Sequence, residues 1–385
     1  MKTEIMTGQD YGLNTFTFEL AQPDDDSALL EILQEMPMEG EIQVLYQSRP
    51  SYFDALQVSG REHQVIVCRK SGDRHIVGFG TRSLKQVFIN GAVMNIGYLS
   101  NLRLQEKYRK GMLLSRGYRY LKALHEGDRR VPAYITTIIE GNSRAVRVLS
   151  SVRAGLPAYR YIGMYQVFAG SFRGARKRFK QTTCQVQKAT ADQLKTIISF
   201  LQDHGREKQF YPYYTLDDFR QAPAGGPLKG LHPEDIFLAF QGNEMVGLLA
   251  RWDQREFKQI IITGYRGKAR LMRPFYNLIS RIMRAPTLPG TGETLHSFYI
   301  GLIAVKNNDP EIFKSLLHEL YDESAATDYS FFVVGLAAQD PLCSALRDFR
   351  TVDYQSRIYF AGWEDSERLY HELDGRIPYL EVGSL

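Results

Sequence analysis

The sequence is poor in cysteine. It has three cysteines in 385 residues, Cys68, Cys184 and Cys343, and they lie far apart. This spacing excludes a disulfide framework and matches no pattern of metal ligands. We therefore expect three reduced thiols and no metal site.

Long hydrophobic runs are also missing. No stretch approaches the roughly 18 apolar residues that a membrane-spanning helix needs. The first ten residues, MKTEIMTGQD, contain no apolar segment of the kind found in secretory signals. These absences predict a protein without a membrane span and a cytoplasmic location.

What the chain does have is the composition of a globular protein. Hydrophobic residues make up 44% and charged residues 24%, with a mild net charge of +5. Because domains usually hold about 100–200 residues, a chain of this length predicts two of them.

Alternating and helical periodicities follow one another through the first half. Asn90-Gly91 is a strong hairpin signal, and Leu113, Leu114, Tyr118, Leu121 and Leu124 recur at helical spacing. The pattern predicts strands at 15–20, 64–68, 75–88, 94–104, 131–139 and 159–168, and helices at 27–35, 113–124 and 145–152.

A basic segment, residues 171–181, interrupts this order and is the predicted linker. The pattern then restarts: strands are predicted at 185–188, 236–240, 244–252, 298–305, 329–335 and 353–361, and helices at 191–204, 310–321 and 341–348. The recurring order predicts an internal repeat, with domains at 1–170 and 182–385.

An insertion at 263–291 carries a predicted amphipathic helix. Its four arginines, Arg270, Arg273, Arg281 and Arg284, fall on one side at about 100° per residue. We expect this helix to dock on the domain through its apolar side and to leave its arginine side in solvent. The alternatives are a surface for an anionic acceptor, a membrane surface or nucleic acid, of which nucleic acid is least favoured because no nucleic-acid-binding motif accompanies it.

Two segments of the first half carry the chemistry. The first is LRLQEKYRKGMLL, residues 102–114, in which a strand leads through a basic turn with Gly111 into a helix. Free N–H groups at such a helix start, helped by the helix dipole, attract phosphate. The second is EGNSRA, residues 140–145, in which Asn142 is placed to cap a short helix.

Together these segments resemble the GCN5-related N-acetyltransferase superfamily. The resemblance covers residues 15–170, and more faintly 182–362. It implies an α/β fold of two tandem domains, each with a mixed, mostly antiparallel twisted sheet flanked by helices. It also implies acetyl-CoA, or another acyl-CoA, as the cofactor.

The resemblance also implies which residues contact the cofactor. By position they are Leu102, Leu104, Arg109, Lys110, Gly111, Met112, Leu113, Leu114, Asn142 and Arg144. The family's loop fits in two registers: one places Arg109 on the family's arginine or glutamine, and the other aligns Gly111. In both registers a leucine stands at the family's second small residue.

Catalysis would need a base more than an acid. Leu149 replaces the tyrosine that the family is proposed to use as acid. Deprotonating an alkyl amine at pH 7 costs about 4.6 kcal/mol, whereas releasing the CoA thiol as an unprotonated thiolate at the same pH costs about 2 kcal/mol. Glu140, at a strand end, is the candidate base, and Tyr98 and Ser100 share a strand face that could carry a water. The alternative for Glu140 is an ordinary surface carboxylate.

The acceptor is predicted to be an amine, in a small molecule or a peptide. Glu39 and Glu41 lie in the loop where family members receive the acceptor, and their charges would favour a cationic amine.

The second half lacks the phosphate loop, because Lys306-Asn307-Asn308-Asp309-Pro310 has no glycine, and Asp340 stands near the position of Asn142. We expect this degenerate domain to support the first or to line the acceptor site. The function predicted is N-acyl transfer, with an acetyl group as the first choice. A catalytically weakened acyl-CoA-binding module is the main alternative, and a basic peripheral or nucleic-acid-associated protein is the second.

Overall fold

The computed structural model describes residues 15–35, 42–72, 74–109, 112–149, 156–172, 183–267, 290–325 and 327–385, together with residues 270, 271, 273 and 277. The side chains of residues 42, 143, 144 and 148 are not described.

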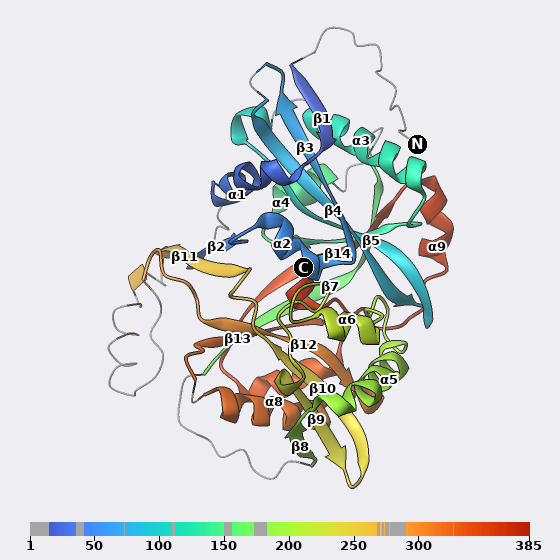
Figure 1. Ribbon diagram of the computed structural model, residues 1–385, viewed down its shortest axis with the longest axis vertical. Helices are drawn as coiled ribbons and strands as arrows, with labels where there is room; N and C mark the ends of the chain where they lie inside the picture. The colour runs from blue at the N-terminus through green and yellow to red at the C-terminus, as the bar shows by residue number, and fades with distance from the viewer. Residues whose placement is uncertain are drawn as a thin grey trace.

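In this part of the chain, twelve strands form one mixed sheet. Their order is β1-β3-β4-β5-β6-β14-β7-β13-β12-β10-β9-β8 (Figure 1). The strands of the first half are β1 (Phe16–Leu20), β3 (Glu62–Lys70), β4 (Ile76–Ile89), β5 (Ala92–Leu104), β6 (Tyr134–Ile139) and β7 (Ala158–Ser171). Those of the second half are β8 (Gln185–Lys188), β9 (Ile236–Gln241), β10 (Glu244–Trp252), β12 (Ser297–Val305), β13 (Phe331–Ala337) and β14 (Thr351–Gly362).

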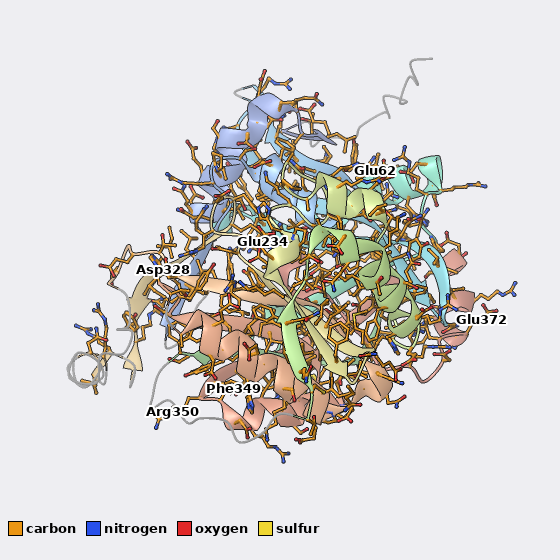
Figure 2. The ribbon with its side chains drawn as sticks, turned by 60° about the horizontal axis from the view of Figure 1, so that its bottom comes forward. Glu62, Glu234, Asp328, Phe349, Arg350 and Glu372 are labelled. Atoms are coloured by element: carbon orange, nitrogen blue, oxygen red, sulfur yellow. The ribbon has the colours of Figure 1, made fainter. Side chains whose placement is uncertain are left out.

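The two halves exchange their last strands. β14 pairs with β6 from Ser356–Ile139 to Ala361–Tyr134, and with β7 along its whole length. β7 in turn pairs with β13 of the second half. Phe349, just before β14, packs on His318 and Tyr321 of the second half's helix α8 (Pro310–Ser324), close to Arg350 in Figure 2. β14 therefore starts in the second half and ends in the first.

Helices cover both faces of the first half's sheet. Successive side chains of a strand point to opposite faces, so Val65 and Val67 of β3 face α1 (Asp26–Gln34) and α2 (Tyr52–Leu56). Ile66, between them, packs with residues of α3 (Leu113–Asp128) and α4 (Ser143–Leu149) on the other face.

The second half has the larger core. Its apolar strands, such as β9 and β12, are buried almost throughout, and they pack against α8 and α5 (Leu194–Gly205). Two short helices, α6 (Leu216–Gln221) and α9 (Glu367–His371), also belong to the second half of the sequence. Tyr370 of α9 packs on Phe360, so α9 lies beside the first half (Figure 1).

A second, two-stranded sheet joins the halves at one side. β2 (Ile42–Gln47) pairs antiparallel with β11 (Gln259–Tyr265), and the pair projects from the main body in Figure 1. Most of the insertion at 263–291 lies outside the described residues. Those that are described at 267, 270, 271, 273 and 277 are helical.

The predicted fold class is confirmed. The predicted order of strands along the chain, which recurs in the two halves, is also correct. The structure adds that the sheets of the two halves form one continuous sheet, because the halves exchange their last strands. Residues 341–348 form a 3-10 helix, in which Asp340 caps the first turn. The sequence patterns did not predict β2, α2, α6, β11 or α9. The domain limits stay a prediction, and most of the linker lies outside the described residues.

None of the described helices is both long enough and apolar enough to cross a membrane.

The strand exchange predicts that both halves unfold in one transition. The two tryptophans report separately, since Trp252 is buried in the second half's core and Trp363 packs beside Tyr134 in the first half. Fluorescence of the Trp252→Phe variant follows Trp363 and hence the first half, and fluorescence of the Trp363→Phe variant follows Trp252 and hence the second half. The denaturation midpoint from each should coincide with the midpoint from circular dichroism. Two separated transitions would contradict this coupling.

Candidate functional site

The candidate site begins where two parallel strands of the first half separate. β5 and β6 pair only at Gly97–Tyr134 and Tyr98–Ile135. Just beyond, the Thr136 hydroxyl donates to the Leu99 carbonyl oxygen at 2.8 Å. Beyond this level the two strands no longer pair with each other, although β5 continues to residue 104 and β6 to residue 139. The backbone edges that face each other across this opening are available to a ligand.

A bulge in β5 lies at the same level. Phe79 pairs with Arg103 and Thr81 with Ser100, so one residue of β4 faces Asn101 and Leu102 together. Asn101 has φ +53°, the left-handed region that asparagine tolerates better than most residues. A bulge redirects the local N–H and C=O groups, and here it does so beside the opening. Leu102 is 43% exposed there.

Gly97 is required by the strand packing below the opening. An added Cβ would lie 2.2 Å from the Tyr134 ring, which crosses β5 at this point. The close approach of the ring to the backbone therefore excludes any side chain at residue 97.

Tyr98 and Ser100 lie together, as the sequence predicted. The Tyr98 hydroxyl is 3.2 Å from the Thr137 hydroxyl of β6, and burial raises the pKa of Tyr98 to about 12. Tyr98 is therefore protonated at neutral pH and can donate a hydrogen bond. The Ser100 Oγ is buried and has no hydrogen-bond partner among the described residues.

Two residues near Ser100, Thr81 and Tyr52, carried no signal in the sequence patterns. Thr81 is the register partner of Ser100 on β4, and the Thr81 hydroxyl is 2.6 Å from the Tyr52 hydroxyl of α2. Burial raises the pKa of Tyr52 to about 12. The face of the sheet under α2 thus carries a row of neutral hydroxyl groups leading to the opening.

Lys85 is a further residue that sequence reasoning missed, although a lysine in the apolar strand 76–89 is unusual. Its ammonium lies 4.6 Å from the centre of the Tyr98 ring and donates to Ser384 Oγ at 2.8 Å. Burial, and then the charge of Lys258, lowers the pKa of Lys85 to about 7. Burial lowers the pKa of Lys258 to about 8.

Glu140 lies at the end of β6 and is engaged by Arg357 of β14. Arg357 Nε donates to Glu140 Oε2 at 2.5 Å and Arg357 Nη2 to Oε1 at 2.5 Å. This hydrogen bonding, and the arginine's charge, lowers the pKa of Glu140. The base role of Glu140 stays a prediction, and the bidentate ion pair argues against it because it makes the carboxylate less basic.

Asn142 caps α4. Its Oδ1 accepts a hydrogen bond from the Ala145 amide at 3.0 Å, as the sequence predicted for this residue. Leu149, at the end of α4, is buried in the cluster that also contains Tyr118 and Tyr159. The hydroxyls of these two tyrosines are 2.6 Å apart.

The start of α3 suits an anion. Its N-cap residue, Met112, makes no side-chain cap, and the first turn contains no acidic residue. Met112 is 61% exposed. Before the helix, Arg109 Nε donates to the Leu104 carbonyl oxygen at 2.8 Å, which ties the basic turn to the end of β5. The uncapped N–H groups and the helix dipole together favour a phosphate here.

The structure therefore brings Tyr98, Ser100, Leu102, Leu104, Arg109, Met112, Leu113 and Leu114 to one strand end and helix start, with Asn142 and Glu140 at the neighbouring strand end. Glu39, Glu41, Lys110, Gly111 and the side chain of Arg144 lie outside the described residues.

A separate pocket of about 840 Å³ lies at the far end of α3. His125, Trp363 and Asp365 line it, with His125 Nε2 2.9 Å from Asp365 Oδ2. None of the residues predicted for the site is in its lining.

The two buried lysines predict a pH-dependent stability. Their pKa values in the folded protein, about 7 and 8, lie below 10.5, so the unfolded chain binds more protons between these limits and stability rises with pH. Lys85→Met should reduce the gain in unfolding free energy between pH 7 and 9 by about 2 kcal/mol. Urea unfolding at both pH values measures this, and an unchanged gain would show that Lys85 is not the group.

Searches with the sequence find no relative: no protein-family model matches, and no curated protein matches either.

Solved structures do match the fold. Saccharomyces cerevisiae N-myristoyltransferase with bound myristoyl-CoA has a TM-score of 0.58 at 12% identity, over 93% of this chain and 81% of that one. The glucosamine N-acetyltransferase region of a fungal multi-domain β-N-acetylglucosaminidase also has a TM-score of 0.58, at 12% identity, over 92% of this chain and 39% of that one.

A third structure spans nearly all of both chains. The GCN5-related N-acetyltransferase from Sphaerobacter thermophilus has a TM-score of 0.53 at 9% identity, over 97% of this chain and 99% of that one. At these identities the likeness concerns the fold. The chain has the fold of the GCN5-related N-acetyltransferase superfamily, as two tandem halves.

Proposed function

We propose that this protein is an N-acyltransferase that moves an acyl group from acyl-CoA to an amine. One observation carries the proposal: in the first half, the opening between β5 and β6, the bulge at Asn101 and the uncapped start of α3 adjoin each other. The similar solved structures include N-acyltransferases, one of them with bound myristoyl-CoA, which supports the same reading.

The first half fits acyl-CoA as a ligand. The phosphates would lie at the N-terminus of α3, held by its N–H groups and by Arg109, Lys110 and Gly111. The remaining arm would run along the exposed edge at Leu102 and Leu104 toward Asn142 and Arg144. Bound there, acyl-CoA supplies an activated thioester.

The chain's own groups would then orient the acceptor and stabilise charge. Backbone N–H groups near Leu102 to Leu104 would donate to the oxygen that becomes negative during transfer. Tyr98, protonated at neutral pH, would donate a further hydrogen bond, and Ser100 would hold a water between the acceptor and the hydroxyl row. The Tyr118 and Tyr159 hydroxyl pair, in the same cluster as Leu149, offers a proton donor in place of the missing tyrosine.

For the acyl group we propose acetyl. Beside Gly97 and Tyr98, where the strands begin to separate, the structure has a cavity of about 20 Å³. Such a volume holds about one water. Because the acyl end and the acceptor amine would meet in this space, it favours a short acyl group over a long chain. For the acceptor we propose an amine in a small molecule or peptide, met in the cytoplasm, with Glu39 and Glu41 attracting its positive charge.

Acyl-CoA binding is the first test. Acetyl-CoA at 100 times its Kd should stabilise the protein by about 2.7 kcal/mol, which a thermal-shift assay would detect, and myristoyl-CoA should bind more weakly. Release of free CoA on addition of a panel of amines would measure transfer. If neither thioester shifts the melting temperature, the proposal fails.

Arg109 gives a sharper test of where the phosphates bind. Arg109→Ala should weaken acetyl-CoA binding about tenfold, because a hydrogen bond to a charged group is lost. Arg119→Ala removes the same charge from an exposed position within α3 and serves as the control. Equal effects of the two changes on Kd would mean that the basic turn has no specific role.

Glu140→Gln tests the predicted base. Because Arg357 holds the carboxylate and keeps its pKa low, we expect kcat to fall less than about tenfold, against the 100-fold or more that loss of a general base causes. The pH–rate profile should keep its shape. Loss of the acidic limb of that profile in the variant would instead identify Glu140 as the base.

A catalytically weakened acyl-CoA-binding module is the alternative function. It is favoured by Leu149, which is buried where the family has its tyrosine. Tight acetyl-CoA binding without CoA release across a broad amine panel would decide for this module.

A further inference from the structure

The two halves repeat the same backbone device. In the second half, β12 and β13 pair in parallel at Phe298–Phe332 and Tyr299–Val333, as β5 and β6 do at Gly97 and Tyr98. Four residues after Phe298, Leu302 has φ +53° at a bulge against β10, just as Asn101 does four residues after Gly97. The second half therefore has its own strand opening with a bulge beside it.

In the second half this opening is already occupied by the chain. The Leu302 amide donates to Glu381 Oε2 at 2.9 Å, and the Ile303 amide donates to the Tyr379 hydroxyl at 3.2 Å. Tyr379 in turn donates to Glu381 Oε2 at 2.9 Å. In the described part of the first half, no side chain accepts from the equivalent amides of Asn101 and Leu102.

The strand ends of the second half are closed as well. Lys208 donates to Asn308 Oδ1 after β12 and to Asp340 Oδ2 after β13, at 2.6 and 2.5 Å. Asp309 caps α8 by accepting from the Glu311 amide at 2.8 Å. The helix start that would face a phosphate therefore carries its own carboxylate, unlike the start of α3.

The occupying segment also reaches the site of the first half. It is the stretch 376–385, which runs between the halves near the middle of Figure 1. The Tyr165 hydroxyl donates to the Leu380 carbonyl oxygen at 2.8 Å, and Lys85 donates to Ser384. Leu380, Glu381 and Leu385 line the cavity beside Gly97 and Tyr98.

We propose that Glu381 is a positioning residue. It is held in the opening of the second half, and from there it fixes segment 376–385. This segment then forms a wall of the first half's site, on the side where the acceptor amine binds. The proposal rests on the function proposed above. The second half would then contribute to transfer by holding this wall, and the chain would bind one acyl-CoA.

The burial of Glu381 needs this explanation. Its side chain is 2% exposed, and within the described residues no cation forms an ion pair with it, although the charge of Lys85 acts on it. Its Oε1 has no hydrogen-bond partner there either. Burying such a carboxylate is costly, so an apolar residue would be favoured if the position served packing alone.

The first experiment counts ligands. Titration of the wild-type chain with acetyl-CoA in a calorimeter should give one equivalent per chain. Two equivalents would overturn the proposal, because the second opening would then accept a ligand. No binding at all would instead remove the proposed function, so the two failures are distinguishable.

The second experiment tests positioning. Glu381→Leu should raise the KM for the amine about tenfold, because hydrogen bonds to a charged group are lost, and it should leave the Kd of acetyl-CoA within about twofold. Hydrogen exchange at the Leu302 and Ile303 amides should become faster. Glu381→Gln, which keeps the shape and one acceptor oxygen, should restore most of the KM.

Glu372→Gln is the matched control, since Glu372 is exposed on the flank of the molecule in Figure 2 and pairs with Arg368. It should change neither constant. An equal loss of amine and acetyl-CoA affinity in Glu381→Leu would mean general destabilisation and overturn the positioning role. If that variant does not fold, Tyr379→Phe keeps the test: a smaller rise in KM supports the anchor, and an unchanged KM refutes it.

Discussion

The arrangement depends on β14, which enters the sheet of the first half between β6 and β7. Its ladder with β6 ends at Ser356–Ile139, with one further bond from the Glu140 amide to the Gln355 carbonyl oxygen at 2.9 Å, and its first residues pair with β7 alone. Because β14 satisfies one edge of β6, β6 can diverge from β5 on its other edge without losing its place in the sheet. The opening that makes the candidate site is therefore maintained by a strand from the other half of the chain.

The same exchange explains how two similar halves can differ in use. Each half has two parallel strands, a bulge with a residue at positive φ, and a helix after the first of these strands. In the first half the loop before the helix is longer and basic, and the helix start is uncapped. In the second half Asp309, Lys208 and Glu381 satisfy the corresponding N–H groups and strand ends. Satisfying a site from within removes its affinity for a ligand and leaves a rigid support.

The centre of the molecule is electrostatically unusual. Two lysines with lowered pKa values, a buried glutamate whose pKa burial raises, and several tyrosines with raised pKa values lie where the halves meet. Burial disfavours every charged form here. The tyrosines therefore stay protonated at neutral pH, and such neutral donors are suited to orienting an amine that must itself lose a proton before it can attack.

The sequence by itself determined most strands of the main sheet and its longer helices, since β5, α3, β6 and the cap at Asn142 follow from local periodicity, a hairpin turn and a helix-capping side chain. It also revealed the repeat, and its motifs pointed to the strand end and helix start of the candidate site. It could not reveal the exchange of β7 and β14, because pairing between distant strands leaves no local signal. The partners of Glu140 and Glu381 were hidden for the same reason: Arg357 and Leu302 lie far along the chain. Tertiary structure alone decided which carboxylate is paired and which of the two openings remains free, because both depend on contacts that form only when the halves come together.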